Sequence, residues 1–364
     1  MSDRSFLDPL HRLLQAALQV EHATIPPYFT AWISIPDGKN SEAAEIIRSV
    51  MLEEMLHLTL VANVLNAVGG SPSLTHPQFV PEYPHQLPHT RRPLMVSIER
   101  FSPEALDTFM SIERPEPPGS RPQAPPFDTL GQFYDYLEEL LVKLCAHHGE
   151  AEVFCGKAER QVPPSGYYGA GQLIVVTDLQ SALTALREIV DQGEGHDGPF
   201  DADPSICGTG REPAHFYRFL EIRAQRRFQE NDKYVPTGAD LPVDYTAVYP
   251  IWSNTRFDEY PPDSPTVHAL EQFASTYGDL LELLEAAFNG HPDRLTQAVH
   301  AMFALKYQAQ ALMRIPSERH PGRTVGVTFD QSRRRTTHPR LSASHPPEAA
   351  WTRIQPSITP SELT

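Results

Sequence analysis

The sequence predicts an all-α protein, a four-helix bundle with additional C-terminal helices and long irregular insertions. Apolar residues recur at spacings of three and four over long stretches such as 7–32 and 46–65, which is the period of a helix with one buried face. Segments that favour strands are few and short, near Val96 and over 172–176. Glutamate and histidine also occupy apolar helix faces, as in bundles that hold a site in their core.

Composition restricts the function classes. The 364 residues, 40% of them apolar, suffice for one large domain or two ordinary ones. The net charge of −16 argues against nucleic acid or an anionic membrane as a partner. No apolar run reaches the length of a membrane span. Three cysteines without metal-like spacing suggest reduced thiols, so we expect a cytoplasmic protein.

The first two helices have clear boundaries. The first runs from about Leu7 to Trp32, and Pro26 and Pro27 inside it predict a kink just after Glu21. A turn at 37–40 leads to the second helix, for which Ser41 is the expected N-cap. The sequence Gly-Gly-Ser-Pro at 69–72 ends that helix.

The later elements alternate with irregular chain. We expect one helical domain over 1–330, with insertions at about 72–128 and 150–210, and a disordered tail rich in Arg, Pro, Ser and Thr over 331–364. The amphipathic periodicity predicts further helices over 103–112, 130–147, 179–191, 216–227, 266–288 and 295–315.

The most informative motif is the pair Glu54 and His57 within the apolar run 46–65. Residues three apart share a helix face, with Cβ atoms about 5–6 Å apart. This face also carries Val50, Val61 and Leu65, so it is the buried one. A carboxylate in a core must be neutralised or must bind something. Glu-x-x-His on a bundle helix is the unit that carboxylate-bridged di-metal proteins use.

Other helices supply candidates for the remaining ligands. Glu21 lies on the apolar face of the first helix, and Glu212 and His215 repeat the Glu-x-x-His spacing. The third carboxylate is either Glu194, which continues the apolar stripe of the helix 179–191, or Glu138, beside the apolar face of 130–147. The order Glu, Glu-x-x-His, Glu, Glu-x-x-His is that of a di-iron or di-manganese site, and carboxylate with imidazole suits Fe or Mn.

Three further residues are candidates for a substrate pocket. Tyr28, Tyr217 and Arg218 lie near the expected ligands in the sequence. Tyrosine and arginine can hydrogen-bond the carboxylate of a small substrate. Residues of these types more often serve packing or a salt bridge, so that alternative stays open for each.

Several segments resemble the bacterial ferritin-like family of the iminophenylpyruvate dimer synthase domain type. The resemblance spans about 7–330 and rests on EHATIPPY at 21–28, EEMLHL at 53–58, NVLNAVGG at 63–70, QGEG at 192–195 and AHFYRF at 214–219. AFNG at 287–290 is a weaker match, and the closing VGVTFD at 325–330 departs from the family pattern at Val327 and Asp330.

The resemblance implies a ferritin-like bundle of the kind encoded in specialised-metabolite pathways. The family's named activity is the oxidative coupling of an imine derived from an aromatic amino acid, and in the large synthases the domain is part of a longer, haem-linked protein. We therefore expect a non-haem di-iron or di-manganese oxidoreductase that uses O₂ on a small, amino-acid-derived substrate. The partners would be that substrate, O₂, an unidentified electron donor and a second copy in a homodimer.

Two other readings remain open at this point. A non-catalytic ferritin-like protein would bind metal for storage or structure and would consume no O₂ with any small molecule. A metal-free bundle would pair its carboxylates with Arg and His, and loss of Glu54 would then destabilise the fold without any change in metal content.

Overall fold

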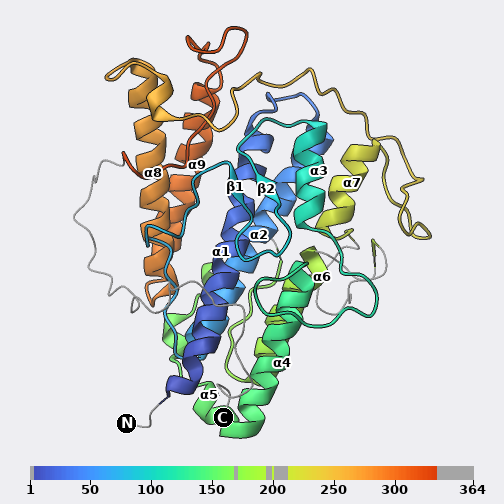
Figure 1. Ribbon diagram of the computed structural model, residues 1–364, viewed down its shortest axis with the longest axis vertical. Helices are drawn as coiled ribbons and strands as arrows, with labels where there is room; N and C mark the ends of the chain where they lie inside the picture. Colours follow the sequence, from blue (N-terminus) through green and yellow to red (C-terminus); the bar gives the residue numbers. More distant parts are fainter. Residues whose placement is uncertain (1–3, 168–170, 194–198, 201–211, 334–364) are drawn as a thin grey trace.

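Helices make up most of the structure, a computed structural model that describes residues 4–167, 171–193, 199–200 and 212–333 (Figure 1). The α-helices are α1 (Asp8–Ile33), α2 (Ser41–Ala67), α3 (Pro103–Ile112), α4 (Leu130–His148), α5 (Glu150–Val153), α6 (Leu179–Gly193), α7 (His215–Ala224), α8 (Pro265–Phe288) and α9 (Arg294–Leu312). Short 3₁₀ helices cover Ser5–Leu7, Ala158–Arg160, Pro164–Gly166 and Phe257–Glu259. The strands β1 (His85–Gln86) and β2 (Met95–Val96) form a small antiparallel ladder.

The long helices α1 and α2 pack against each other in the centre of the molecule (Figure 1). Helix α1 continues through Pro26 and Pro27 as one element. Proline has no N–H, so Pro27 cannot bond the Ala23 carbonyl four residues earlier. The Tyr83 hydroxyl donates to that carbonyl instead, at 3.3 Å. The freed backbone group is therefore satisfied beside the segment that holds Glu21.

Two pairs of shorter helices cover one side of α1 and α2. Helices α4 and α6 pack together along one half, and α3 and α7 pack together along the other (Figure 1). Helix α6 also contacts α7. The end of α3, the end of α6 and the start of α7 therefore meet near the middle of the two long helices. This junction brings helix termini, with their side chains, to the centre of the bundle.

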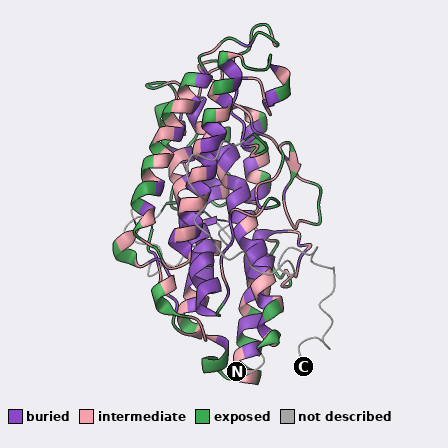
Figure 2. Ribbon diagram, turned by 90° about the vertical axis from the view of Figure 1, so that its left-hand side faces the viewer, coloured by how far each residue is buried: buried purple, intermediate pink, exposed green. Residues whose placement is uncertain are grey.

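Helices α8 and α9 form a hairpin against the other side of the central pair (Figure 1). Buried positions follow the inner helices along their length, whereas the outer helices expose one face (Figure 2). The Asn66 side chain at the end of α2 donates to the Phe288 carbonyl at 2.5 Å. Glu285 accepts the backbone N–H groups of Leu74 and Thr75 at 2.7 and 2.8 Å. These bonds fix the hairpin to the end of α2 and to the chain that follows it.

The predicted all-α bundle with C-terminal helices is confirmed, and most boundaries differ by three residues or fewer. One cap differs: Asn40, with φ of 40°, precedes α2, and Ser41 is its first helical residue. The segment 172–176, expected to be extended, forms no strand ladder within the described chain. At the start of the tail that the sequence predicts to be disordered, the Gln331 side-chain amide donates to the Ala274 carbonyl at 3.2 Å. The rest of the predicted tail, 334–364, lies outside the described residues.

None of the helices within the described ranges combines the length and the apolar character that a membrane span requires.

Candidate metal centre

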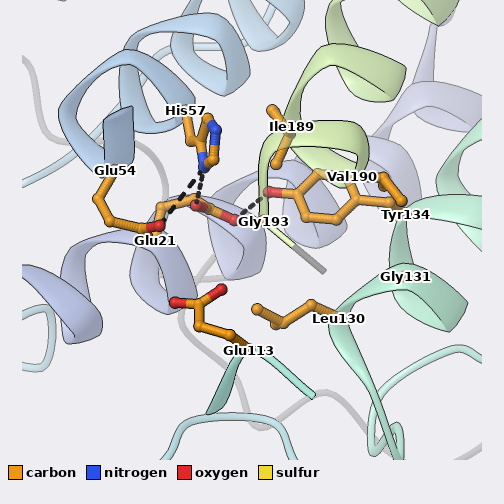
Figure 3. Close-up of a pocket in the computed structure, with 10 residues that line it drawn as sticks. All are labelled: Glu21, Glu54, His57, Glu113, Leu130, Gly131, Tyr134, Ile189, Val190 and Gly193. Atoms are coloured by element: carbon orange, nitrogen blue, oxygen red, sulfur yellow. Dashed lines mark hydrogen bonds and ion pairs between the residues drawn. The ribbon is translucent and has the colours of Figure 1, made fainter. Parts of the chain in front are cut away.

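Five buried side chains converge where the helix ends meet α1 and α2. Glu21 comes from α1, and Glu54 and His57 come from α2. Glu113 directly follows α3, and His215 is the first residue of α7. Each is at most 2% exposed. Figure 3 shows the three carboxylates and His57 pointing toward one another.

The five side chains form two similar halves around Glu54. Oε1 of Glu54 lies 3.6 Å from Nδ1 of His57 and 2.8 Å from Nδ1 of His215. On one side, Glu21 Oε2 lies 3.5 Å from the His57 nitrogen, and on the other, Glu113 Oε2 lies 3.6 Å from the His215 nitrogen. Glu54, His57 and His215 also offer ligand atoms that lie within 4.8 Å of one another. Each half thus has one imidazole and one carboxylate, with Glu54 shared.

Hydrogen bonds at the outer ring nitrogens set the orientation of both histidines. Nε2 of His215 donates to Glu53 Oε2 at 2.8 Å. Nε2 of His57 donates to Gln192 Oε1 at 2.9 Å. Because both acceptors are oxygens, both Nε2 atoms carry hydrogen in the neutral rings, and each Nδ1 directs a lone pair at the cluster. Metal-bound histidines are usually held by such a bond from the other ring nitrogen.

The chemistry of this donor set fits a cation. Nδ1 of His215 is buried and has no hydrogen-bond partner among the described residues, although a Glu54 oxygen lies 2.8 Å away. A nitrogen lone pair and a carboxylate oxygen that face each other at this distance repel unless a proton or a metal ion lies between them. Three carboxylates and two imidazoles are also the ligand types that Fe and Mn take.

The pKa values within the cluster have the directions expected for an excess of buried acid. Burial and the negative charge of Glu113 raise the pKa of Glu54 to about 7. Burial lowers the pKa of His215, but the neighbouring carboxylates of Glu113, Glu53 and Glu54 outweigh this effect and raise it well above the usual range. The metal-free cluster therefore retains protons at neutral pH. Bound metal would displace them, since metal ligands must be deprotonated.

Glu53, the neighbour of Glu54, has a different environment. Burial raises its pKa, but the Arg218 guanidinium and His215 outweigh burial and lower the pKa to about 2. Arg218 contacts both Glu53 oxygens, donates to Ser49 Oγ at 3.1 Å and donates to the Pro213 carbonyl at 2.6 Å. Its guanidinium is thus used within the protein. The structure does not support the predicted role of Arg218 in holding a substrate carboxylate.

Two buried tyrosines donate hydrogen bonds to Glu113 and Glu21, the two carboxylates of the cluster that the halves do not share. Tyr28 donates to Glu113 Oε1 at 2.5 Å, and Tyr134 of α4 donates to Glu21 Oε1. Burial and the adjacent carboxylates raise the pKa of both hydroxyls, so both remain donors at neutral pH. Tyr28 was a pocket candidate and does contact the cluster. Tyr217 does not, because it packs in a separate group with Phe216 and Phe228.

The ferritin-like family model matches residues 14–224, a range that includes all five side chains. The chain belongs to the ferritin-like family. This ferritin-like chain is 26% identical over 344 residues to dichlorochromopyrrolate synthase of Lentzea aerocolonigenes. The alignment covers 81% of the chain but 30% of that relative, so the chain spans less than a third of the relative's length.

A crystal structure of a ferritin-like protein from Caulobacter vibrioides shares the fold. The TM-score is 0.55 at 23% sequence identity, and the match covers 82% of this chain and 95% of the other. This similarity supports the fold, whereas the family match and the Lentzea relative confirm the resemblance seen in the sequence.

Two predicted ligands, Glu212 and Glu138, do not join the cluster of this ferritin-like chain. Glu212 is exposed, and its carboxylate pairs with Arg218 at 3.2 Å. Glu138 pairs with Arg187 of α6 at 3.4 Å, beside the α4–α6 contact. Glu194 lies outside the described residues. Of the predicted ligands, the structure thus brings together Glu21, Glu54, His57 and His215.

Glu113 is the carboxylate that the sequence reasoning missed. Sequence patterns predict a mostly irregular insertion over 72–128 and place the third carboxylate on a later helix. A signal was present: Leu106, Phe109 and Glu113 lie on one helical face at spacings of three and four. Leu106 and Phe109 are fully buried, and Glu113 continues their stripe into the centre of the bundle.

A small cavity borders the cluster between the start of α4 and the end of α6 (Figure 3). Its walls combine four cluster residues with apolar groups such as Leu130 and Ile189. The volume of about 10 Å³ is close to what a single water molecule needs. The cavity is therefore large enough to hold one molecule of about the size of water beside the carboxylates.

Proposed function

We propose that this ferritin-like protein is a non-haem, metal-dependent oxidoreductase that uses O₂ to oxidise a small, amino-acid-derived substrate in specialised metabolism. The proposal rests on one observation. The Nδ1 atoms of His57 and His215 point at three buried carboxylates, and a hydrogen bond from the Nε2 atom of each ring fixes its orientation. The name of the Lentzea relative, a synthase, supports a biosynthetic role.

The cluster residues would hold a pair of Fe or Mn ions, with Glu21 and His57 on one side, Glu113 and His215 on the other, and Glu54 between them. When bound, such ions supply the redox chemistry that transfers electrons from an organic substrate to O₂. Removal of two electrons and two protons from one substrate molecule reduces O₂ to hydrogen peroxide. Two such oxidations reduce O₂ to two water molecules.

The protein's own groups would keep this site fixed and dry. Tyr28 and Tyr134 hold the two outer carboxylates, and Gln192 and Glu53 hold the two rings. Five protein side chains leave coordination positions open for small ligands. The narrow cavity limits which molecules approach those positions.

The test is O₂ consumption by protein loaded anaerobically with Fe(II) or Mn(II). Aromatic amino acids and their 2-oxo and 2-imino acids form the substrate panel, and the Glu54→Ala variant is the control. We expect one substrate to increase O₂ uptake above that of the loaded protein alone, with a fixed ratio of substrate consumed to O₂ consumed. Metal binding without any substrate-dependent uptake would instead support storage or a structural role.

A substitution at Gly193 tests whether small ligands use the cavity. A Cβ atom at this position would lie 3.6 Å from Glu113 Oε2, an ordinary contact, so Gly193→Ala should fit. The larger side chain of Gly193→Val would fill the cavity. Overpacking typically costs about 1–3 kcal/mol, and a loss of that size in the binding of azide to the loaded site is about 5- to 150-fold in affinity. Metal content should be unchanged in both variants, and equal azide affinities would contradict this route.

A further inference from the structure

The two histidines of the cluster donate their outer ring N–H groups to acceptors of different charge. Behind His215, the ring N–H donates to the carboxylate of Glu53 at 2.8 Å. Arg218 contacts both oxygens of Glu53, so this acceptor is an ionised carboxylate within an ion pair. Behind His57, the ring N–H donates to the amide oxygen of Gln192 at 2.9 Å, and this acceptor is neutral.

The orientation of the Gln192 amide is set by Glu188, one turn earlier on α6. The Gln192 Nε2 group donates to Glu188 Oε1 at 2.5 Å. A carboxylate acceptor can pair only with the NH₂ end of the amide, so the oxygen end must face His57. Glu188 is 1% exposed, and its other oxygen has no hydrogen-bond partner among the described residues. The buried carboxylate thus holds the amide without reaching the ring itself.

A hydrogen bond to a carboxylate increases the basicity of a metal-binding imidazole, because the ring gains electron density as its N–H is polarised. Hydrogen bonds to charged acceptors are roughly twice as strong as those to neutral ones. Nδ1 of His215 should therefore be a stronger donor than Nδ1 of His57. The remaining donors do not remove this difference, since each half has one further carboxylate, itself held by a tyrosine.

We propose that Glu188 and Gln192 are positioning residues that make the His57–Glu21 half of the cluster the weaker of two metal positions, filled second and lost first. This inference rests on the proposed metal centre. A second observation gives it a consequence: the small cavity is lined by the shared Glu54, by both ligands of this half, Glu21 and His57, and by Glu113 but not His215 of the other half. The cavity thus borders more of the weaker position than of the stronger one.

The test exchanges the two groups within α6. In the double variant Glu188→Gln, Gln192→Glu, the ring N–H of His57 faces a carboxylate, which in turn accepts from an amide, and the net charge stays the same. Metal-free protein is titrated anaerobically with Fe(II), and with Co(II) as a visible-absorption probe. We expect two steps in the wild-type protein. In the exchange variant the weaker step should tighten by about 10-fold, at the low end of the effect of groups behind a ligand.

A control variant and a second test variant separate a change at His57 from a general effect of added charge or a failure to fold. Gln180→Glu adds an acid to the exposed start of the same helix, and both steps should remain unchanged. If the exchange variant fails to fold, Gln192→Met removes only the amide. It should weaken the second step by about 10- to 100-fold and leave the first unchanged. Equal affinities in the wild-type protein, a single step, or an exchange variant that behaves like wild type would overturn the inference. No metal binding in the wild-type protein would instead refute the proposed metal centre.

Discussion

The Glu54→Ala variant is expected to lose both metal positions, because Glu54 is the carboxylate that the two halves share. Its Oε1 lies within 3.6 Å of Nδ1 of both histidines. Substitution of groups behind a ligand typically weakens metal binding by about 10- to 100-fold, and removal of a direct ligand should exceed about 100-fold. Metal content per chain after equilibrium dialysis against Fe(II) or Mn(II) measures the effect.

The stability of the metal-free variant separates a metal centre from a structural ion-pair network. Burial and the Glu113 charge already disfavour ionised Glu54 in the metal-free protein. A metal centre therefore predicts two ions in the wild-type protein, and a metal-free Glu54→Ala whose unfolding temperature falls only by the loss of side-chain packing and of the hydrogen bond from Thr24. If the cluster is only a structural network of ion pairs, Glu54→Ala should unfold at a clearly lower temperature than the wild-type protein, and neither protein should bind metal. The second result would contradict the metal centre.

The Arg218→Met variant is expected to cause the largest loss of stability. Arg218 is 5% exposed and neutralises Glu53, which is 8% exposed. Methionine keeps much of the side-chain volume but leaves the carboxylate buried without its cation. Removal of one partner of a buried ion pair typically costs about 3–5 kcal/mol. The free energy of unfolding from urea denaturation, with metal absent, measures the loss.

The same helix offers a matched control. Arg223 pairs with Asp107 at 2.8 Å, but the two side chains are 42% and 54% exposed. Arg223→Met should therefore cost about 0–1 kcal/mol, the usual range for exposed pairs. The double variant Glu53→Gln, Arg218→Met removes the uncompensated charge and keeps an acceptor for His215, so it should recover most of the lost stability. Equal losses in Arg218→Met and Arg223→Met would contradict the buried pair.

The helices and most of the cluster could be predicted because local sequence determines both. Apolar periodicity gives the extent of a helix, and α1 and α2 carry Glu21, Glu54 and His57 on faces that this periodicity identifies as buried. His215 could be identified by its spacing from Glu212. The site is thus formed largely by residues whose orientation follows from the helix in which they lie.

The same spacing rule was misleading at Glu212, for a local reason. Residues three apart share a face only when both lie in the helix. Helix α7 begins at His215, with Ala214 as its N-cap, so Glu212 and Pro213 precede the helix. The carboxylate therefore points to solvent and meets Arg218. A proline two residues before the histidine was compatible with either reading, and only the position of the first helical turn decides between them.

Glu113 shows the other limit of sequence reasoning. It follows a ten-residue helix inside a proline-rich insertion, and its position depends on how α3 and α7 pack onto α1 and α2. The contact of Gln192 with His57 likewise joins residues 135 positions apart. Such contacts depend on tertiary packing of short helices, which periodicity within one helix does not determine.

The most direct test of the metal centre is the metal content of the wild-type protein, purified from cells supplemented with Fe and Mn and reconstituted anaerobically. The two halves around Glu54 predict two Fe or Mn ions per chain. The absence of bound metal after reconstitution would contradict the account.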